Sequence, residues 1–175
     1  MDEEKLKLMQ RYVANIAISG STLRNQGAEG VTSAARAFLS GLDLNVLGET
    51  EPEQYPNLLD EWTEQLRARL PAGARNWGTA RKALNVFMVQ AFMNKYLDKE
   101  YGLNKFGDVL ETPLDNKAAN KLRKRAGGGK LPRWNGIINL REDGSQQYQE
   151  FASTVARQER ISRACLDIIL WRANE

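Results

Sequence analysis

Residues 78–92 read GTARKALNVFMVQAF, and the recurrence of their apolar side chains decides the fold. The apolar positions return every three to four residues as far as Tyr96, so on a helix they cover more than half of its circumference. A helix that is apolar on most sides is buried on most sides. The pattern therefore predicts a long central helix over 78–101, built on Ala83, Leu84, Phe87, Met88, Ala91, Phe92 and Tyr96.

The rest of the chain shows the same helical period. No alternation of apolar and polar residues persists anywhere, so no strand is expected. The sequence predicts an all-α fold in which a single domain, 1–175, holds about seven helices. These are expected through Leu6 to Ala17, then over about 28–39, 58–70, 78–101, 113–126, 147–158 and 162–172, with a loop over 41–56.

Two residue types that often carry chemistry are nearly or wholly missing. The chain has no histidine, which excludes His-based acid–base catalysis, Ser-His-Asp and Cys-His nucleophile systems and His-ligated metals. It has one cysteine, Cys165, which excludes disulfides and metal clusters built from its own thiolates. We therefore expect no metal site and no cofactor. Any chemistry falls to Asp, Glu, Lys, Arg, Tyr, Ser or Thr.

Composition and terminal sequence place the chain among ordinary globular proteins. Of its 175 residues, 42% are apolar and 27% are charged. No apolar run reaches the roughly 18 residues of a membrane helix. The charged start, MDEEK, lacks the layout of a secretory signal. These features favour a cytoplasmic protein that has no membrane partner.

Positive charge is concentrated in the middle of the chain. Residues 1–60 carry five Lys and Arg against nine Asp and Glu, whereas residues 101–140 carry eight against three, and the net charge is +3. A basic centre between acidic ends is typical of contact with a phosphate backbone. The alternative is a solvated helix face followed by a basic loop. The densest run contains Lys117, Lys121, Arg123, Lys124, Arg125, Lys130 and Arg133.

Two segments resemble a known superfamily. Residues 78–86, GTARKALNV, preceded by Leu70-Pro71, resemble the hairpin-to-helix segment of the helix-hairpin-helix DNA glycosylases, which include endonuclease III and the 8-oxoguanine glycosylases. The resemblance implies a helix-hairpin-helix-like element near residues 70–90, and it places the Schiff-base nucleophile on Lys82. Residues 113–122, PLDNKAANKL, resemble the later element of the superfamily and place its catalytic acid on Asp115.

A third segment, LRNQGA at residues 23–28, is similar to the one whose glutamine fills the gap left by an extruded base, which places that role on Gln26. The three matches occur in the superfamily's order and together cover about half of the chain. Two departures are visible. Ala80 replaces a usual hairpin glycine, and Lys82 and Asp115 lie 33 residues apart, a spacing closer to the archaeal 8-oxoguanine branch than to most of the superfamily.

The local sequence also favours these roles on physical grounds. A lysine attacks only as the neutral amine, and Lys82 is expected in the first turn of its helix, where the positive end of the macrodipole and neighbouring Arg81 both disfavour its charge. The alternative is a lysine that contacts phosphate or water. Asp115 is expected to cap its helix, which keeps the carboxylate ionised. Asp167 is a rival acid, unless Arg163 pairs with it four residues earlier.

These matches predict a DNA glycosylase, with or without abasic-site lyase activity, whose partner is duplex DNA with an extruded base. The alternative is a non-catalytic helical module that binds nucleic acid or protein. Trp77 and Trp134 either stack on a base or close the hydrophobic core. The expected nucleic-acid contacts are Gln26, Arg75, Trp77, Gly78, Arg81, Lys121, Arg123, Lys124, Arg125, Lys130, Arg133 and Trp134.

Overall fold

The computed structural model describes residues 2–26 and 28–172 and confirms the all-α fold class, since those residues form helices and no strand. None of these helices is both long enough and apolar enough to span a bilayer. Five short 3-10 turns join them. The α-helices are α1 (Glu3–Ala17), α2 (Val31–Ser40), α3 (Val46–Glu49), α4 (Tyr55–Arg69), α5 (Trp77–Phe92), α6 (Lys95–Tyr101), α7 (Asn116–Ala126), α8 (Glu142–Glu159) and α9 (Leu166–Arg172).

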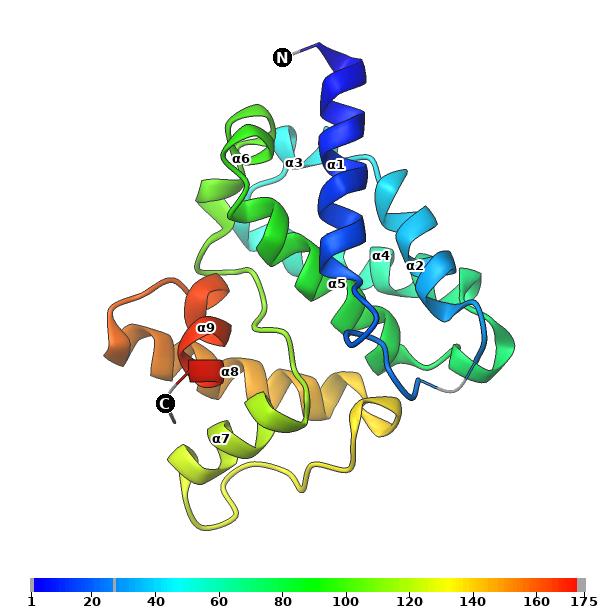
Figure 1. The fold of residues 1–175 in the computed structure, drawn as a ribbon. Coiled ribbons are helices and arrows are strands. Elements are labelled where there is room, and N and C mark those ends of the chain that lie inside the picture. The colour runs from blue at the N-terminus through cyan, green and yellow to red at the C-terminus, as the bar shows by residue number, and fades with distance from the viewer. Residues whose placement is uncertain (1, 27, 173–175) are drawn as a thin grey trace.

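Helix α5 is the central element, as its sequence predicts. It packs against α1, α2, α4 and α6, and its N-terminal half meets the 3-10 turn Ile137–Asn139. Figure 1 shows α5 running through the middle of the molecule, between the N-terminal helices and the group formed by α7, α8 and α9. Ala80, Ala83, Leu84 and Phe87 are fully buried, so successive turns of α5 are enclosed by protein.

The predicted helix over 78–101 is wrong in its extent, because it is two helices. Helix α5 ends at Phe92, and the Asn94 side chain accepts the backbone N–H groups of Tyr96 and Leu97 at 3.1 and 3.2 Å, which caps α6. Asparagine is among the strongest N-cap residues. Several other boundaries also differ from expectation, by three to five residues. Helix α8 starts at Glu142 instead of 147, and the expected loop over 41–56 contains α3.

Buried side chains form two clusters that meet beside α5. The first joins α1 to α6, and the second joins α7, α8, α9 and the irregular segment 131–140. A close approach lies at Gly78 in the first turn of α5, where an added Cβ would lie 2.0 Å from the Ile137 carbonyl oxygen. Only glycine lets the backbone of the 131–140 segment lie this close. This contact fixes that segment over α5.

Replacing Gly78 with alanine should therefore destabilise the protein. The new methyl group would have to displace backbone, and overpacking of this kind costs about 1–3 kcal/mol of the free energy of unfolding. Urea denaturation followed by circular dichroism measures the loss. Gly48→Ala is the matched control, since nothing lies within 4 Å of the Cβ that it adds. Equal stability of the two variants would contradict the packing described here.

Candidate active site

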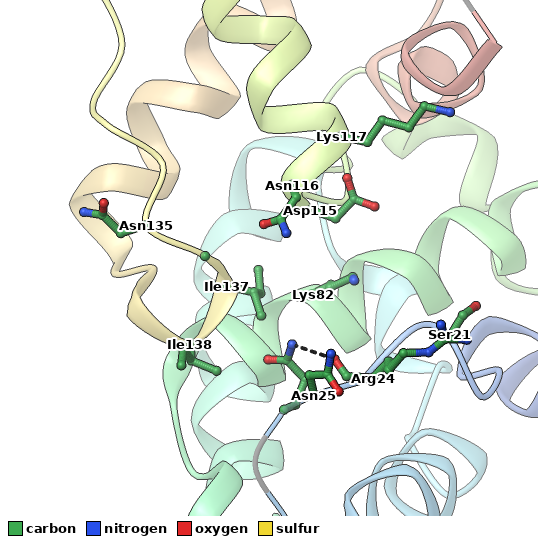
Figure 2. A pocket seen from close by; sticks show the side chains of 12 residues that line it. Ser21, Arg24, Asn25, Lys82, Asp115, Asn116, Lys117, Asn135, Ile137 and Ile138 are labelled. Atoms are coloured by element: carbon green, nitrogen blue, oxygen red, sulfur yellow. Dashed lines mark hydrogen bonds between the residues drawn. The ribbon is translucent and has the colours of Figure 1, made fainter.

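A pocket of about 440 Å³ lies where four parts of the chain meet. These parts are the loop before α2, the middle of α5, the N-terminus of α7 and the 131–140 segment (Figure 2). The pocket therefore contains Lys82, Asp115 and Gln26, which the sequence singles out in three separate segments. Its full lining is Ser21, Arg24, Asn25, Gln26, Lys82, Asp115, Asn116, Lys117, Asn135, Gly136, Ile137 and Ile138.

Lys82 reaches the pocket because of where α5 begins. The Asn76 side chain caps the helix by accepting the Thr79 backbone N–H at 2.9 Å, so α5 starts at Trp77 and Lys82 is its sixth residue. The expected first-turn position is thus wrong, and the helix macrodipole has little influence this far in. The pKa of the Lys82 amine is nevertheless lowered, chiefly because burial disfavours the charged form, while the carboxylates of Asp115 and Asp167 act in the opposite direction.

Asp115 caps α7, as its sequence position predicts. One carboxylate oxygen accepts the Ala118 backbone N–H at 2.8 Å, and the Asp115 backbone is extended. Figure 2 shows the Asp115 side chain facing Lys82 across the pocket. Among the described residues no ion pair joins the two groups, so the space between the amine and the acid is available to a ligand.

Asp167, on α9, interacts electrostatically with both Lys82 and Asp115. The expected pairing with Arg163 is wrong, because that guanidinium donates to three backbone carbonyl groups, those of Val109, Leu110 and Gln149. The pKa of Asp167 is raised to about 6, first because burial penalises the charge, then because the Asp115 carboxylate repels it, whereas Lys82 lowers it. An acid with this pKa is partly protonated near neutral pH.

Gln26 lies in the pocket wall, but its side-chain amide is hydrogen-bonded to other residues of the protein. The side chain is only 9% exposed. Its Oε1 accepts the Thr79 hydroxyl at 2.8 Å and its Nε2 donates to the Arg24 carbonyl at 3.2 Å. Insertion of Gln26 into a duplex would break both bonds, so the expected gap-filling role stays a prediction that requires this side chain to rearrange. Its neighbour Asn25 is exposed and holds a left-handed backbone, φ 60°, at the pocket edge.

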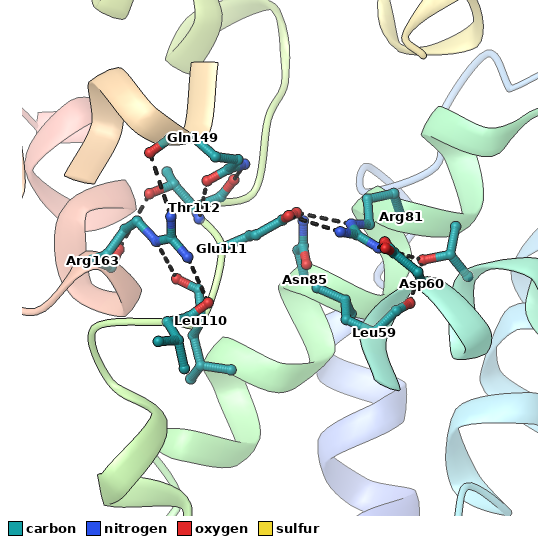
Figure 3. Close-up of polar contacts among 11 residues, drawn as sticks. Leu59, Asp60, Arg81, Asn85, Leu110, Glu111, Thr112, Gln149 and Arg163 are labelled. Atoms are coloured by element: carbon teal, nitrogen blue, oxygen red, sulfur yellow. Dashed lines mark hydrogen bonds and ion pairs between the residues drawn. The ribbon is translucent and has the colours of Figure 1, made fainter. Parts of the chain in front are cut away.

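Arg81 and Trp77 lie on another side of α5, away from the pocket. The Arg81 guanidinium is 5% exposed, pairs with Glu111 at 2.8 Å and Asp60 at 2.6 Å, and stacks on the Trp77 ring at 5.0 Å (Figure 3). A buried guanidinium with two carboxylate partners has no capacity left for phosphate, and Trp77 also packs against the second cluster. The expected nucleic-acid contacts of Arg81 and Trp77 stay predictions, and these contacts within the protein weigh against them.

The remaining contacts expected near the hairpin are largely structural. Gly78 is covered by the 131–140 segment, so its backbone is closed to phosphate. Trp134 donates its indole N–H to Asn116 Oδ1 at 2.6 Å and packs edge-on against Tyr148, which anchors the segment to α7 and α8. Arg75 is exposed in the 70–76 connection, where its Nε donates to the Leu70 carbonyl. The helix-hairpin-helix element expected here stays a prediction.

Lys117 lines the pocket, but the rest of the basic run predicted to hold phosphate follows from Lys121 to Arg133, toward and beyond the C-terminal end of α7. The 11 residues of α7 span roughly 16 Å, and the pocket receives only the N-terminal end. Arg125 pairs with Glu159 at 2.5 Å, and the Lys121 ammonium is enclosed with no hydrogen-bond partner among the described residues. The other cations are at least partly exposed and are open to phosphate. They are Arg123, Lys124, Lys130 and Arg133.

Sequence reasoning missed the residues that close the pocket from the 131–140 segment. Asn135 and Ile138 are exposed and reach the pocket from a stretch that follows neither helical nor strand periodicity. Among the described residues, no three Asp, Glu or Cys side chains converge to hold a metal ion. Comparison of the chain with protein-family models, curated proteins and solved structures found no match in any of the three. Function is therefore inferred from the pocket itself.

The contrast between neighbouring Arg81 and Lys82 can be measured directly. Arg81→Met should lower the free energy of unfolding by about 3 kcal/mol, because it strands the largely buried Glu111 carboxylate. Lys82→Met should leave this free energy unchanged or raise it, since burial already disfavours the Lys82 charge. Urea titrations at pH 7 give both values. The reverse order of stability would disprove the assignment of Arg81 to the core and Lys82 to the pocket.

Asp167→Asn should change how stability depends on pH. The folded-state pKa of about 6 lies above the ordinary value of 3.8, so the folded protein holds this proton more tightly and loses stability as the pH rises from about 4 through 6. Asparagine does not ionise, so the Asp167→Asn variant does not lose this stability as the pH rises. We expect the stability gain of Asp167→Asn to grow from pH 4.5 to pH 7, measured by thermal or urea unfolding. Exposed Asp143→Asn serves as the control, and a gain that did not change with pH would refute the assignment.

Proposed function

We propose that this chain is a DNA glycosylase with abasic-site lyase activity, which removes a damaged or modified base from DNA. One observation carries the proposal: Lys82 and Asp115, each placed by its resemblance to the helix-hairpin-helix glycosylases, line the same pocket. They come from segments 33 residues apart, and a chance resemblance of two unrelated segments gives no reason for them to meet. The 440 Å³ pocket has the size of sites that take small organic groups.

In the proposed reaction the neutral Lys82 amine attacks the anomeric carbon of the sugar. A carbon–nitrogen bond forms to Lys82, the glycosidic bond breaks, and its electron pair leaves with the base, which takes up a proton. Asp115 stabilises the positive charge that develops on the sugar and accepts a proton from the attacking amine. The C1′–O4′ bond then breaks as the nitrogen lone pair forms the iminium, and the ring oxygen takes up the proton that Asp115 accepted. A base removes a proton from C2′ of this iminium, so that the carbon–oxygen bond to the 3′ phosphate breaks, the phosphate leaves with the electron pair and the strand is nicked.

The electrostatics of the pocket suit this division of roles. Burial lowers the pKa of Lys82, which increases the fraction of amine able to attack. The cap interaction holds Asp115 at the start of α7, so the acid needs no rearrangement before the reaction. Arg24 and Asn25 stand at the pocket edge, where a strand carrying an extruded base would pass. The exposed cations beyond α7 would hold more distant phosphates.

Borohydride trapping tests the covalent step. Borohydride reduces the iminium to a stable amine, so a labelled duplex containing an abasic site or 8-oxoguanine should cross-link to the protein. Lys82→Gln should abolish the cross-link. Lys99→Gln removes an exposed cation on α6 instead, away from the pocket and from the expected DNA contacts, and should trap normally. Base release without any cross-link would contradict the lysine mechanism and leave a monofunctional glycosylase.

Asp115→Asn separates the role of the carboxylate from that of the cap. Asparagine caps helices as well as aspartate does, so α7 should stay folded while the negative charge is lost. We expect base release to fall by at least about 100-fold, within the range usual for general acid–base groups, with DNA binding retained. If no base is released from any duplex tested, the enzyme proposal fails. A steep salt dependence of binding would then favour a nucleic-acid-binding module, and negligible binding a protein-interaction bundle.

A further inference from the structure

A second cavity, of about 300 Å³, is lined by α5 but contains neither Lys82 nor Asp115. Helices α4, α5 and α8 form its walls, and Figure 3 shows part of the polar network beneath it. Successive residues of a helix point about 100° apart, so Arg81 faces this cavity while Lys82 faces the first. Nothing in the proposed glycosylase reaction uses this second cavity.

The lining of the second cavity carries excess negative charge. Four carboxylates line it, against the guanidinium groups of Arg81 and Arg163, which leaves an excess of two negative charges. Both guanidinium groups are committed to the protein, Arg81 to carboxylates and Arg163 to three backbone carbonyls. Asp60 and Glu111 are the partners of Arg81, so the excess charge belongs to the exposed Glu142 and Glu150, and the cavity favours a cation over an anion. The four carboxylates are Asp60, Glu111, Glu142 and Glu150.

A buried hydroxyl in the same lining lacks a partner. Ser145 on α8 is 2% exposed, and its Oγ has no hydrogen-bond partner within residues 2–26 and 28–172. The Ser145 backbone N–H already bonds to the Arg141 carbonyl, as in any helix. Buried hydroxyl groups are almost always paired, because an unpaired one loses its bonds to water without replacement. A donor that enters the cavity would satisfy this oxygen.

We propose that this cavity binds a compact organic cation, a guanidinium or alkylammonium group, through its carboxylates and the Ser145 hydroxyl. The indole of Trp77 forms part of the wall and offers an aromatic surface to the cation or its methylene stem. The shared chemistry fits a free small molecule and equally an arginine or lysine side chain presented by another protein. This site acts independently of the glycosylase reaction, so either proposal can fail without the other.

Isothermal titration calorimetry on the full chain tests the site with matched probes. Argininamide and 1,4-diaminobutane represent free cations, and the blocked tripeptide Gly-Arg-Gly represents a protein side chain. The citrulline analogue of argininamide has the same shape without the charge, and it should bind at least about tenfold more weakly. Binding of the free cations identifies a small-molecule site, whereas binding of the tripeptide alone identifies a side-chain site. Binding of no probe, or equal binding of the citrulline analogue, overturns the proposal.

Two variants locate the binding. Ser145→Ala removes the unpaired hydroxyl, so the unliganded variant should be at least as stable as the natural chain and should bind the probes about tenfold more weakly. Glu150→Gln removes an exposed carboxylate of the lining and should weaken binding similarly without a folding defect. Glu4→Gln, on α1, removes the same charge elsewhere and should leave the affinity unchanged. Unaltered affinity in both lining variants contradicts the site.

Discussion

The contact between the first turn of α5 and the backbone of the 131–140 segment is the constraint on which the rest of the structure depends. At Gly78 the two backbones approach so closely that no side chain fits between them. The contact joins the two buried clusters and brings Asn135 and Ile138 over the pocket that holds Lys82. Trp134 secures the other side of the segment to α7 through Asn116. The start of α7, with Asp115, is also held near α5 by Glu111, which pairs with Arg81.

Helix α5 places two neighbouring cations, Arg81 and Lys82, in opposite electrostatic environments. Arg81 is buried with two carboxylates, so its charge is retained and neutralised within the protein. Lys82, the next residue, is half-buried without an ion pair among the described residues, so desolvation acts against its charge and lowers its pKa. A single helix thus carries a structural cation and the amine of the proposed nucleophile at adjacent positions. The direction in which each side chain leaves the helix axis determines whether it meets the carboxylates of Asp60 and Glu111 or enters the pocket.

Helical periodicity and helix capping depend on residues close together in the chain, so both can be predicted from the sequence. The central burial of α5 and the cap at Asp115 follow from such local patterns. The break at Asn94 was missed because Tyr96 and Leu97 continue the apolar period across it. The burial of Gln26 depends on Thr79, which lies 53 positions later, and the fate of Arg81 depends on Asp60 and Glu111. Local patterns carry no information on such distant partners, nor on the aperiodic 131–140 segment.

Asp115 holds the first turn of α7 together and also points into the pocket. Helix ends open and close far more readily than whole domains unfold. Each time this turn opens, the carboxylate leaves its place opposite Lys82 although the hydrophobic clusters remain intact. Opening of this one turn therefore empties one wall of the pocket while the molecule stays folded, and a ligand that binds the carboxylate would hold the turn closed.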